Sequence, residues 1–191
     1  MPTIKMDSKI LPILYRFCGQ ALRYPDSGWP MADLQTRFQE ILTIVKADEE
    51  GQELSRFFAA EKEESILETL QIEYTRLFIN SYGGVVAPLY ASVYIDGILW
   101  GAFSETIRER YLRSGYSPDD TNEPPDHLAT QLEFLALLHE SGRPTEAEQF
   151  LAQSFRPWFS RFYQRFSAGN PHIFYRVLVE LIDYLTLEEE P

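Results

Sequence analysis

The chain has 191 residues, of which 45% are hydrophobic and 14% aromatic, a composition typical of a globular protein and not of a disordered one. Its formal net charge of -12 argues against nucleic acid as a partner, because the phosphates would be repelled. The single cysteine, Cys18, excludes an intrachain disulfide, and no stretch approaches the roughly 20 apolar residues of a membrane span. We therefore expect one cytoplasmic domain over residues 1–191, without a transmembrane segment.

Apolar residues recur at helical spacing along most of the chain. The predicted helices cover residues 8–24, 31–45, 53–60, 61–78, 103–113, 125–140, 145–166 and 171–187. The charged stretch 46–51 is expected to end one helix, and Pro157 is expected to break or restart another. The sequence thus predicts an all-α, single globular helical domain of about eight or nine helices.

Two long irregular loops interrupt the helical pattern, at residues 80–101 and 116–125. The first contains the pair Gly83-Gly84 and several aromatic residues, and a brief extended piece is expected at residues 93–95. Loops of this length are unusual within a compact domain and are often functional. The first loop is therefore a candidate wall of a binding site.

The second loop leads into the sequence Glu123-Pro124-Pro125-Asp126-His127. Proline suits the first turn of a helix, and an aspartate is favourable near the positive end of the helix dipole. The charged form of His127 would be disfavoured there, which leaves a neutral imidazole that can donate and accept. These residues either begin a helix or form part of a binding site.

Motifs for catalysis or metal binding are missing from the sequence. It has no phosphate-binding loop, no dinucleotide-binding glycine motif and no nucleophile elbow, and we predict no metal site. Among the other histidines, His139 suits the end of a helix, and His172 is expected to be exposed in a first turn. A small helical hydrolase or nucleotide-dependent enzyme that uses Asp126 and His127 as acid and base is an alternative. Neighbouring residues on a helix point about 100° apart, which suits that pairing poorly. An oligomeric scaffold is a third possibility.

Three blocks of residues occur in order along the chain. The first block consists of Tyr74, Leu77-Phe78, Pro88, Ser92-Val93-Tyr94 and Gly101. The second consists of Glu123-Pro124, Asp126-His127 and Leu132-Glu133-Phe134. The third, a looser match, consists of Phe150-Leu151, Trp158 and Phe174-Tyr175. These blocks resemble the TorD/DmsD/NarJ family of redox-enzyme maturation chaperones. The resemblance implies an all-helical cytoplasmic chaperone that binds the twin-arginine signal peptide of a molybdoenzyme precursor. Such a chaperone would hold back export until the molybdenum cofactor is loaded, and the mature part of the precursor is a further expected contact.

The resemblance also carries expectations about assembly and cofactors. It implies a monomer or a domain-swapped dimer. Some relatives are described as binding guanine nucleotide; this chain has no phosphate-binding motif, so the resemblance leaves nucleotide binding open, and no cofactor is expected from the residues themselves. The chain departs from some relatives at Leu89-Tyr90-Ala91, which puts the identity of the client oxidoreductase in doubt more than the general activity.

A binder of a twin-arginine leader needs carboxylates for two guanidinium groups and an aromatic, apolar wall for the segment that follows them. The candidate signal-peptide-binding residues are Glu123, Pro124, Asp126, His127, Tyr74, Pro88, Tyr90 and Trp100. The net charge of -12 would favour encounter with a basic leader. No catalytic residue is predicted.

Overall fold

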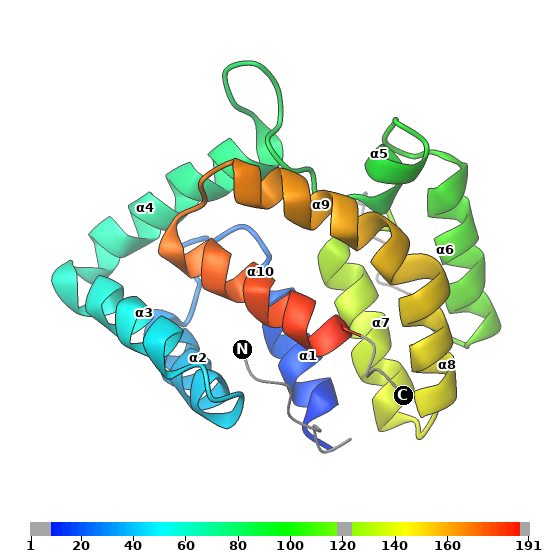
Figure 1. Cartoon of the computed structure of the whole chain (residues 1–191), viewed down its shortest axis with the longest axis horizontal. Coiled ribbons are helices and arrows are strands. Elements are labelled where there is room, and N and C mark those ends of the chain that lie inside the picture. The colour runs from blue at the N-terminus through cyan, green and yellow to red at the C-terminus, as the bar shows by residue number, and fades with distance from the viewer. Residues whose placement is uncertain (1–8, 118–123, 188–191) are drawn as a thin grey trace.

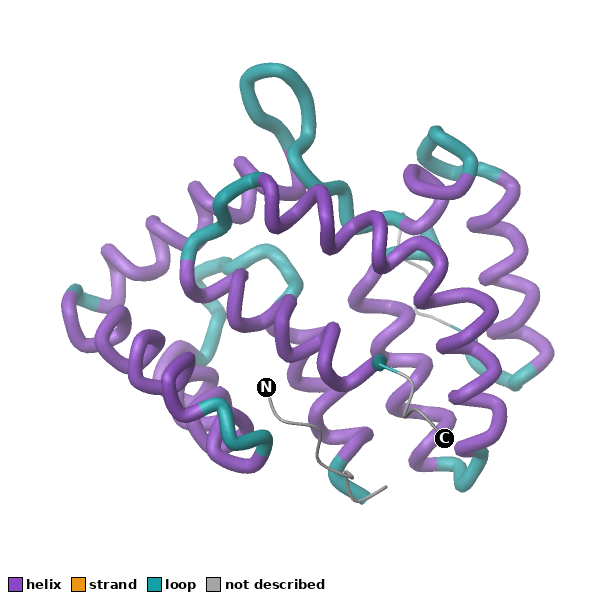
Figure 2. The backbone as a smooth tube through the Cα atoms, viewed as in Figure 1, coloured by secondary structure: helices purple, strands orange, loops and turns teal. Residues whose placement is uncertain are grey.

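The computed structural model describes residues 9–117 and 124–187, and in these ranges every regular element is helical (Figures 1 and 2). The prediction of an all-α fold is confirmed. The helices are α1 Leu11–Ala21, α2 Met31–Ile44, α3 Asp48–Ala60, α4 Glu63–Tyr74 with a π-helical turn at Thr75–Ile79, α5 Ala91–Ile95, α6 Ala102–Arg113, α7 Leu128–Glu140, α8 Pro144–Phe150, a second π-helical turn at Leu151–Phe155, α9 Arg156–Ala168 and α10 Ile173–Thr186.

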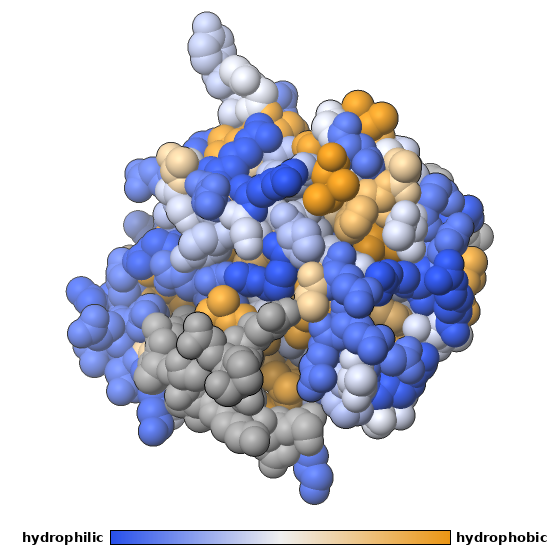
Figure 3. Space-filling view, turned by 45° about the vertical axis from the view of Figure 1, so that its right-hand side comes forward, coloured by the Kyte–Doolittle hydropathy of each residue, from blue (hydrophilic) through white to orange (hydrophobic). Residues whose placement is uncertain are grey.

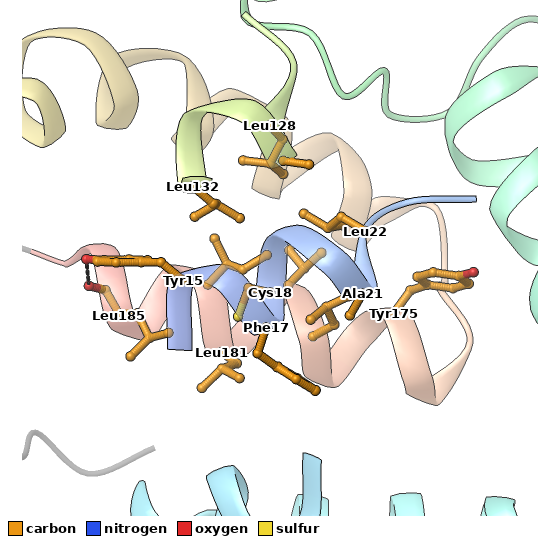
Figure 4. Close-up of a cluster of buried hydrophobic side chains, with 14 of the residues drawn as sticks. Tyr15, Phe17, Cys18, Ala21, Leu22, Leu128, Leu132, Tyr175, Leu181 and Leu185 are labelled. Atoms are coloured by element: carbon orange, nitrogen blue, oxygen red, sulfur yellow. Dashed lines mark hydrogen bonds between the residues drawn. The ribbon is translucent and has the colours of Figure 1, made fainter. Parts of the chain in front are cut away.

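Helix α1 forms the centre of the core, between α7 and α10 (Figure 4). Leu128 and Leu132 of α7 cover one side of it, and Leu181 and Leu185 of α10 cover the other. All four side chains are buried, and each stabilises the fold by about 1.5–3 kcal/mol relative to an exposed one. The hydroxyl of Tyr15 donates to the carbonyl oxygen of Leu185 at 2.9 Å, so its one polar group is also satisfied.

Helices α2 and α3 form a hairpin at one end of the molecule and pack on α10 (Figure 1). Phe38 of α2 and Phe58 of α3 each lie edge-on to Phe174 of α10, with ring centroids 5.7 and 6.3 Å away. The acidic stretch that was expected to separate helices instead begins α3, at Asp48. Its carboxylates occupy the first turn, where the helix dipole favours negative charge.

Pro157 was expected to break or restart the helix that carries it, and the second form of this prediction is confirmed, because α9 begins at Arg156, directly before Pro157. The π-helical turn Leu151–Phe155 joins α8 to α9 directly, and the N–H of Arg156 donates to the carbonyl oxygen of Leu151. Pro157 follows in the first turn of α9, where the missing N–H of proline costs little. The helical chain therefore bends at this point and continues (Figure 1).

The predicted extended piece at residues 93–95 is wrong, because these residues belong to the short helix α5. A five-residue helix is too short to be stable alone, so tertiary contacts must hold it. Before α5, the chain forms a loop that projects from the molecule (Figure 1). Gly83 and Gly84 lie in it with φ of +96° and +108°, a backbone conformation that favours glycine.

The surface is predominantly hydrophilic on the face shown in Figure 3, with hydrophobic residues gathered toward its upper part. Ile98, Leu99 and Trp100 are all exposed, in the loop between α5 and α6. Among the helices in residues 9–117 and 124–187, none combines the length and the apolarity needed to cross a membrane.

Candidate functional site

The turn that precedes α7 differs from the prediction. Pro124 and Pro125 are buried and lie before the helix, which begins at Leu128 and not at Pro125. His127 has extended backbone angles, and its Nδ1 accepts a hydrogen bond of 3.2 Å from the N–H of Ala129. The imidazole thus caps α7, a role more often taken by serine, threonine or aspartate. The residues before it form an elbow outside the helix.

The elbow lies against the end of the first irregular loop. Tyr90 and His127 form an isolated antiparallel bridge, and their rings meet edge-on with centroids 5.1 Å apart. The N–H of Leu128 donates to the carbonyl oxygen of Leu89 at 2.8 Å, and the N–H of Ala91 donates to that of Asp126 at 3.2 Å. Two segments that the sequence separates by more than thirty residues are therefore joined by backbone hydrogen bonds.

Asp126 is fully buried, with a relative exposure of 0%. Its Oδ2 accepts a hydrogen bond of 2.6 Å from the N–H of Ser92, in the first turn of α5. Its carbonyl oxygen accepts from Nε2 of Gln131 at 2.7 Å, and Oε1 of Gln131 accepts from Nε1 of Trp158 at 3.3 Å. Oδ1 of Asp126 has no hydrogen-bond partner within the described ranges. The carboxylate therefore caps α5 from inside the protein and presents no surface to solvent.

His127 is neutral at physiological pH. Burial, helped by the nearby positive charge of Arg23, lowers the pKa of its imidazole to about 3. A neutral imidazole was expected from the sequence, but its main cause is desolvation and not the position at a helix end. His127 is only 3% exposed, so its neutral ring forms a largely apolar part of the wall beside the elbow.

A pocket of about 250 Å³ opens beside His127. Three segments meet there: the residues after α1, the end of α4 with its π-helical turn, and the Tyr90–His127 bridge. The lining residues are Arg23, Tyr24, Tyr74, Phe78, Ile79, Leu89, Tyr90 and His127. Tyr74 meets Tyr24 and Phe78 edge-on, with ring centroids 5.5 and 5.0 Å away. The wall is thus mainly aromatic and aliphatic.

Three of the predicted site residues come together in this pocket: Tyr74, Tyr90 and His127. They come from three different stretches of the chain, and no periodicity in the sequence relates them. Of the three, Tyr90 is half-buried, whereas the other two are buried. Tyr90 is therefore the most accessible of the three to a ligand.

The other predicted residues lie outside the pocket lining. Asp126 and Pro124 are buried behind it in the elbow, and Pro88 is half-buried next to the lining residue Leu89. Trp100 is 53% exposed in the loop between α5 and α6. Glu123 lies outside the described residues.

Several lining residues were not predicted from the sequence. Phe78 belongs to the same block as Tyr74 but was not among the candidate binding residues; it lines the pocket although it is only 5% exposed. Arg23 and Tyr24 follow α1, and only the packing of α1 on α7 brings them to the elbow. No motif in the chain links these residues to the elbow.

Comparison with known protein families shows that residues 45–164 match the family described as nitrate reductase delta subunit. Among curated proteins, the chain is 36% identical over 117 residues to the Tat proofreading chaperone DmsD of Salmonella paratyphi A, a match that covers 60% of this chain and 57% of that protein. It is 35% identical over 118 residues to the chaperone protein TorD of Actinobacillus succinogenes, a match that covers 59% of each. The aligned regions thus span less than two thirds of these relatives' lengths.

A solved structure is similar over nearly the whole chain. The crystal structure of a protein from Archaeoglobus fulgidus, named for redox enzyme maturation, matches with a TM-score of 0.65 and 25% sequence identity. The match covers 97% of this chain and 99% of that one, so the described fold is shared from end to end.

Proposed function

This chain belongs to the nitrate reductase delta subunit family, and from that premise we propose that it is a cytoplasmic chaperone for a twin-arginine molybdoenzyme precursor. It would bind the signal peptide of the precursor and hold back export until the cofactor is inserted. The relatives named DmsD and TorD are chaperones, which supports this function over an enzymatic one.

The observation that carries the proposal is the pocket in which Tyr74, Tyr90 and His127 meet. Its aromatic rings suit the apolar part of a leader, and ring faces also attract guanidinium groups. At about 250 Å³ it accommodates one or two side chains and not a whole leader, so the rest of the peptide would lie across the surface outside it. We infer that the pocket anchors one point of the leader.

Asp126 and Pro124 would act by shaping this pocket. Asp126 holds the start of α5 and the bridge at Tyr90, so its loss would move a wall of the pocket without removing a direct contact. Contacts from Glu123, Pro88 and Trp100 to the leader remain part of the proposal. The overall charge of -12 would draw a basic leader toward this surface, and salt would weaken that attraction.

The geometry gives little support to acid–base chemistry. His127 uses Nδ1 to cap α7, and Asp126 uses Oδ2 to cap α5, so both side chains hold backbone groups in place. A general acid or base must reach the proton that it moves, and Asp126 is fully buried. The same two residues therefore fit a binding module better than a hydrolase.

The test is calorimetric titration of the protein with twin-arginine leader peptides from the molybdoenzymes of its host. We expect at least one leader to bind, and the variant Tyr90→Ala to bind it about tenfold more weakly, because an aromatic contact in a pocket is lost. Tyr82→Ala is the matched control, since Tyr82 is fully exposed and does not line the pocket.

Two results would contradict the proposal. The first is that no leader binds to the folded wild-type protein. The second is that Tyr90→Ala and Tyr82→Ala bind the leader equally well, which would place the leader elsewhere. Turnover of nucleotides or simple esters by the wild-type protein would favour the enzymatic alternative.

A further inference from the structure

The proposed leader pocket contains a positive charge of its own. Arg23 is one of its lining residues, and its guanidinium lies near enough to His127 to help lower the pKa of that imidazole. A leader that carries two arginines would meet a like charge there, and the repulsion is substantial where water is partly excluded. The position of Arg23 is therefore important for any basic ligand.

Arg23 is held by a carboxylate of α7. Its Nη2 donates to Oε1 of Glu133 at 2.7 Å, and the two side chains are 46% and 29% exposed. The contact is possible because α1 approaches α7 closely at Gly19. A Cβ on Gly19 would lie 3.2 Å from the carbonyl oxygen of Ala129 and 3.6 Å from Cγ of Glu133. Glu133 is thus placed against α1, and Arg23 extends from the pocket wall to reach it.

Glu133 is better placed than Asp126 to receive an arginine from outside. The side chain of Glu133 is 29% exposed, whereas Asp126 is completely buried and its Oδ2 is occupied by the N–H of Ser92. A carboxylate can accept two parallel hydrogen bonds from one guanidinium, which makes the geometry specific for arginine over lysine. Of these two carboxylates, Glu133 is therefore the accessible one, and it is bound by Arg23, a residue that lines the pocket.

We propose that Glu133 is the carboxylate that binds an arginine of the leader, and that Arg23 occupies it until the leader displaces it. This inference rests on the proposed function. The exchange replaces one guanidinium–carboxylate pair by another of the same kind, so little binding energy is lost at Glu133 itself. Arg23 is half exposed and can turn its charge into solvent when it is released. The contact thus makes the free protein selective, because only a ligand with a guanidinium group competes well.

The chain contains a matched pair that serves as a control. Arg16 of α1 binds Glu140 of α7 through Nε–Oε1 and Nη2–Oε2 contacts of 2.8 and 2.6 Å. These side chains are 51% and 39% exposed, and neither residue lines the pocket. Both ion pairs join α1 or the residues after it to α7, but only Arg23 reaches the pocket.

The experiment is calorimetric titration of a leader peptide into wild type, Arg23→Gln and Arg16→Gln. Because Arg23→Gln lacks the guanidinium that competes with the leader for Glu133, we expect this variant to bind the leader about two- to sixfold more tightly. Arg16→Gln should bind it as wild type does. Glu133→Gln should weaken binding about fivefold or more, and Glu140→Gln should not change it. A leader with two lysines in place of the arginines should gain less from Arg23→Gln than the natural leader does.

The inference is overturned if Arg23→Gln binds the leader no more tightly than wild type, or if Glu133→Gln binds it equally well. In that case the proposed function stands, since wild type still binds. If neither wild type nor Arg23→Gln binds any leader while circular dichroism shows both folded, the proposed function fails and this inference fails with it.

Discussion

Oδ2 of Asp126 accepts a 2.6 Å hydrogen bond from the backbone N–H of Ser92, across 34 positions of the chain. The bond joins the elbow before α7 to the first turn of α5, and both partners have a relative exposure of 0%. Asp126 therefore stabilises the fold, and this role is separate from any contact with a ligand. It follows that the two roles can be separated by mutation.

Asp126→Ala should destabilise the protein by about 1–3 kcal/mol, because the buried N–H of Ser92 loses its acceptor. Asp126→Asn keeps an acceptor oxygen and should cost about 1 kcal/mol or less. Urea unfolding followed by circular dichroism measures both. Asp33→Ala is the control, since that aspartate forms an exposed ion pair on α2, and its loss should cost about 0.5 kcal/mol or less. If Asp126→Asn is as stable as wild type but binds the leader much more weakly, Asp126 has a direct role in binding after all.

The stability of the protein should fall as the pH falls from about 6.5 toward 3. Burial lowers the pKa of His127 in the folded state to about 3, so the unfolded chain takes up this proton first and is favoured on acidification. Between pH 7.5 and 5 the expected loss from this residue is about 2 kcal/mol. Urea unfolding at a series of pH values measures it.

The variant His127→Asn tests whether that residue is the cause. Asparagine can cap α7 in place of the imidazole but does not titrate, so the loss of stability between pH 7.5 and 5 should become much smaller. Some dependence should persist, because burial also lowers the pKa of His139 and of His172. An unchanged pH dependence in His127→Asn would contradict the assignment.

Cys18 should react with thiol reagents only when the protein unfolds. It is the single cysteine of the chain, it is 0% exposed on α1 between α7 and α10, and burial raises the pKa of its thiol (Figure 4). Labelling in water should be slower than for a free thiol by a factor on the order of 10³ or more, and urea should accelerate it in step with unfolding. In a Cys18→Ala background, Tyr82→Cys should react at the rate of a free thiol. Rapid labelling of native wild type would show that the core around α1 opens locally.

Gly101→Ala should destabilise the start of α6. A Cβ at this position would lie 2.2 Å from Oδ2 of Asp96, the atom that accepts a 2.8 Å hydrogen bond from the N–H of Phe103. Displacement of this cap should cost about 1 kcal/mol or more in thermal unfolding. Gly51→Ala within α3 is the matched control, because its nearest neighbour is the flexible end of Gln39 at 3.3 Å, and helix propensity favours alanine. Equal melting temperatures for both variants would show that the Asp96 cap contributes little.

The sequence predicted most helices because their signals are local. Apolar residues that recur at helical spacing mark the buried stripe of a helix such as α7 or α10, and hydrogen bonds within a helix join neighbours in the chain. The errors fall where the decisive contact is distant. Helix α5 depends on Asp126. His172, expected to be exposed, is half-buried because its N–H donates to Oε1 of Glu73 in α4 and its ring contacts that of Phe57 in α3.

The sequence by itself determined the all-α class and the family resemblance, since helical periodicity and short motifs are local features of the chain. Only the tertiary structure decided that Tyr74, Tyr90 and His127 share one pocket, that Asp126 faces inward and that Arg23 is held by Glu133. The physical reason is that pockets, burial and ion pairs between helices depend on how α1, α4 and α7 pack. That packing is set by the whole core and not by any one stretch of the chain.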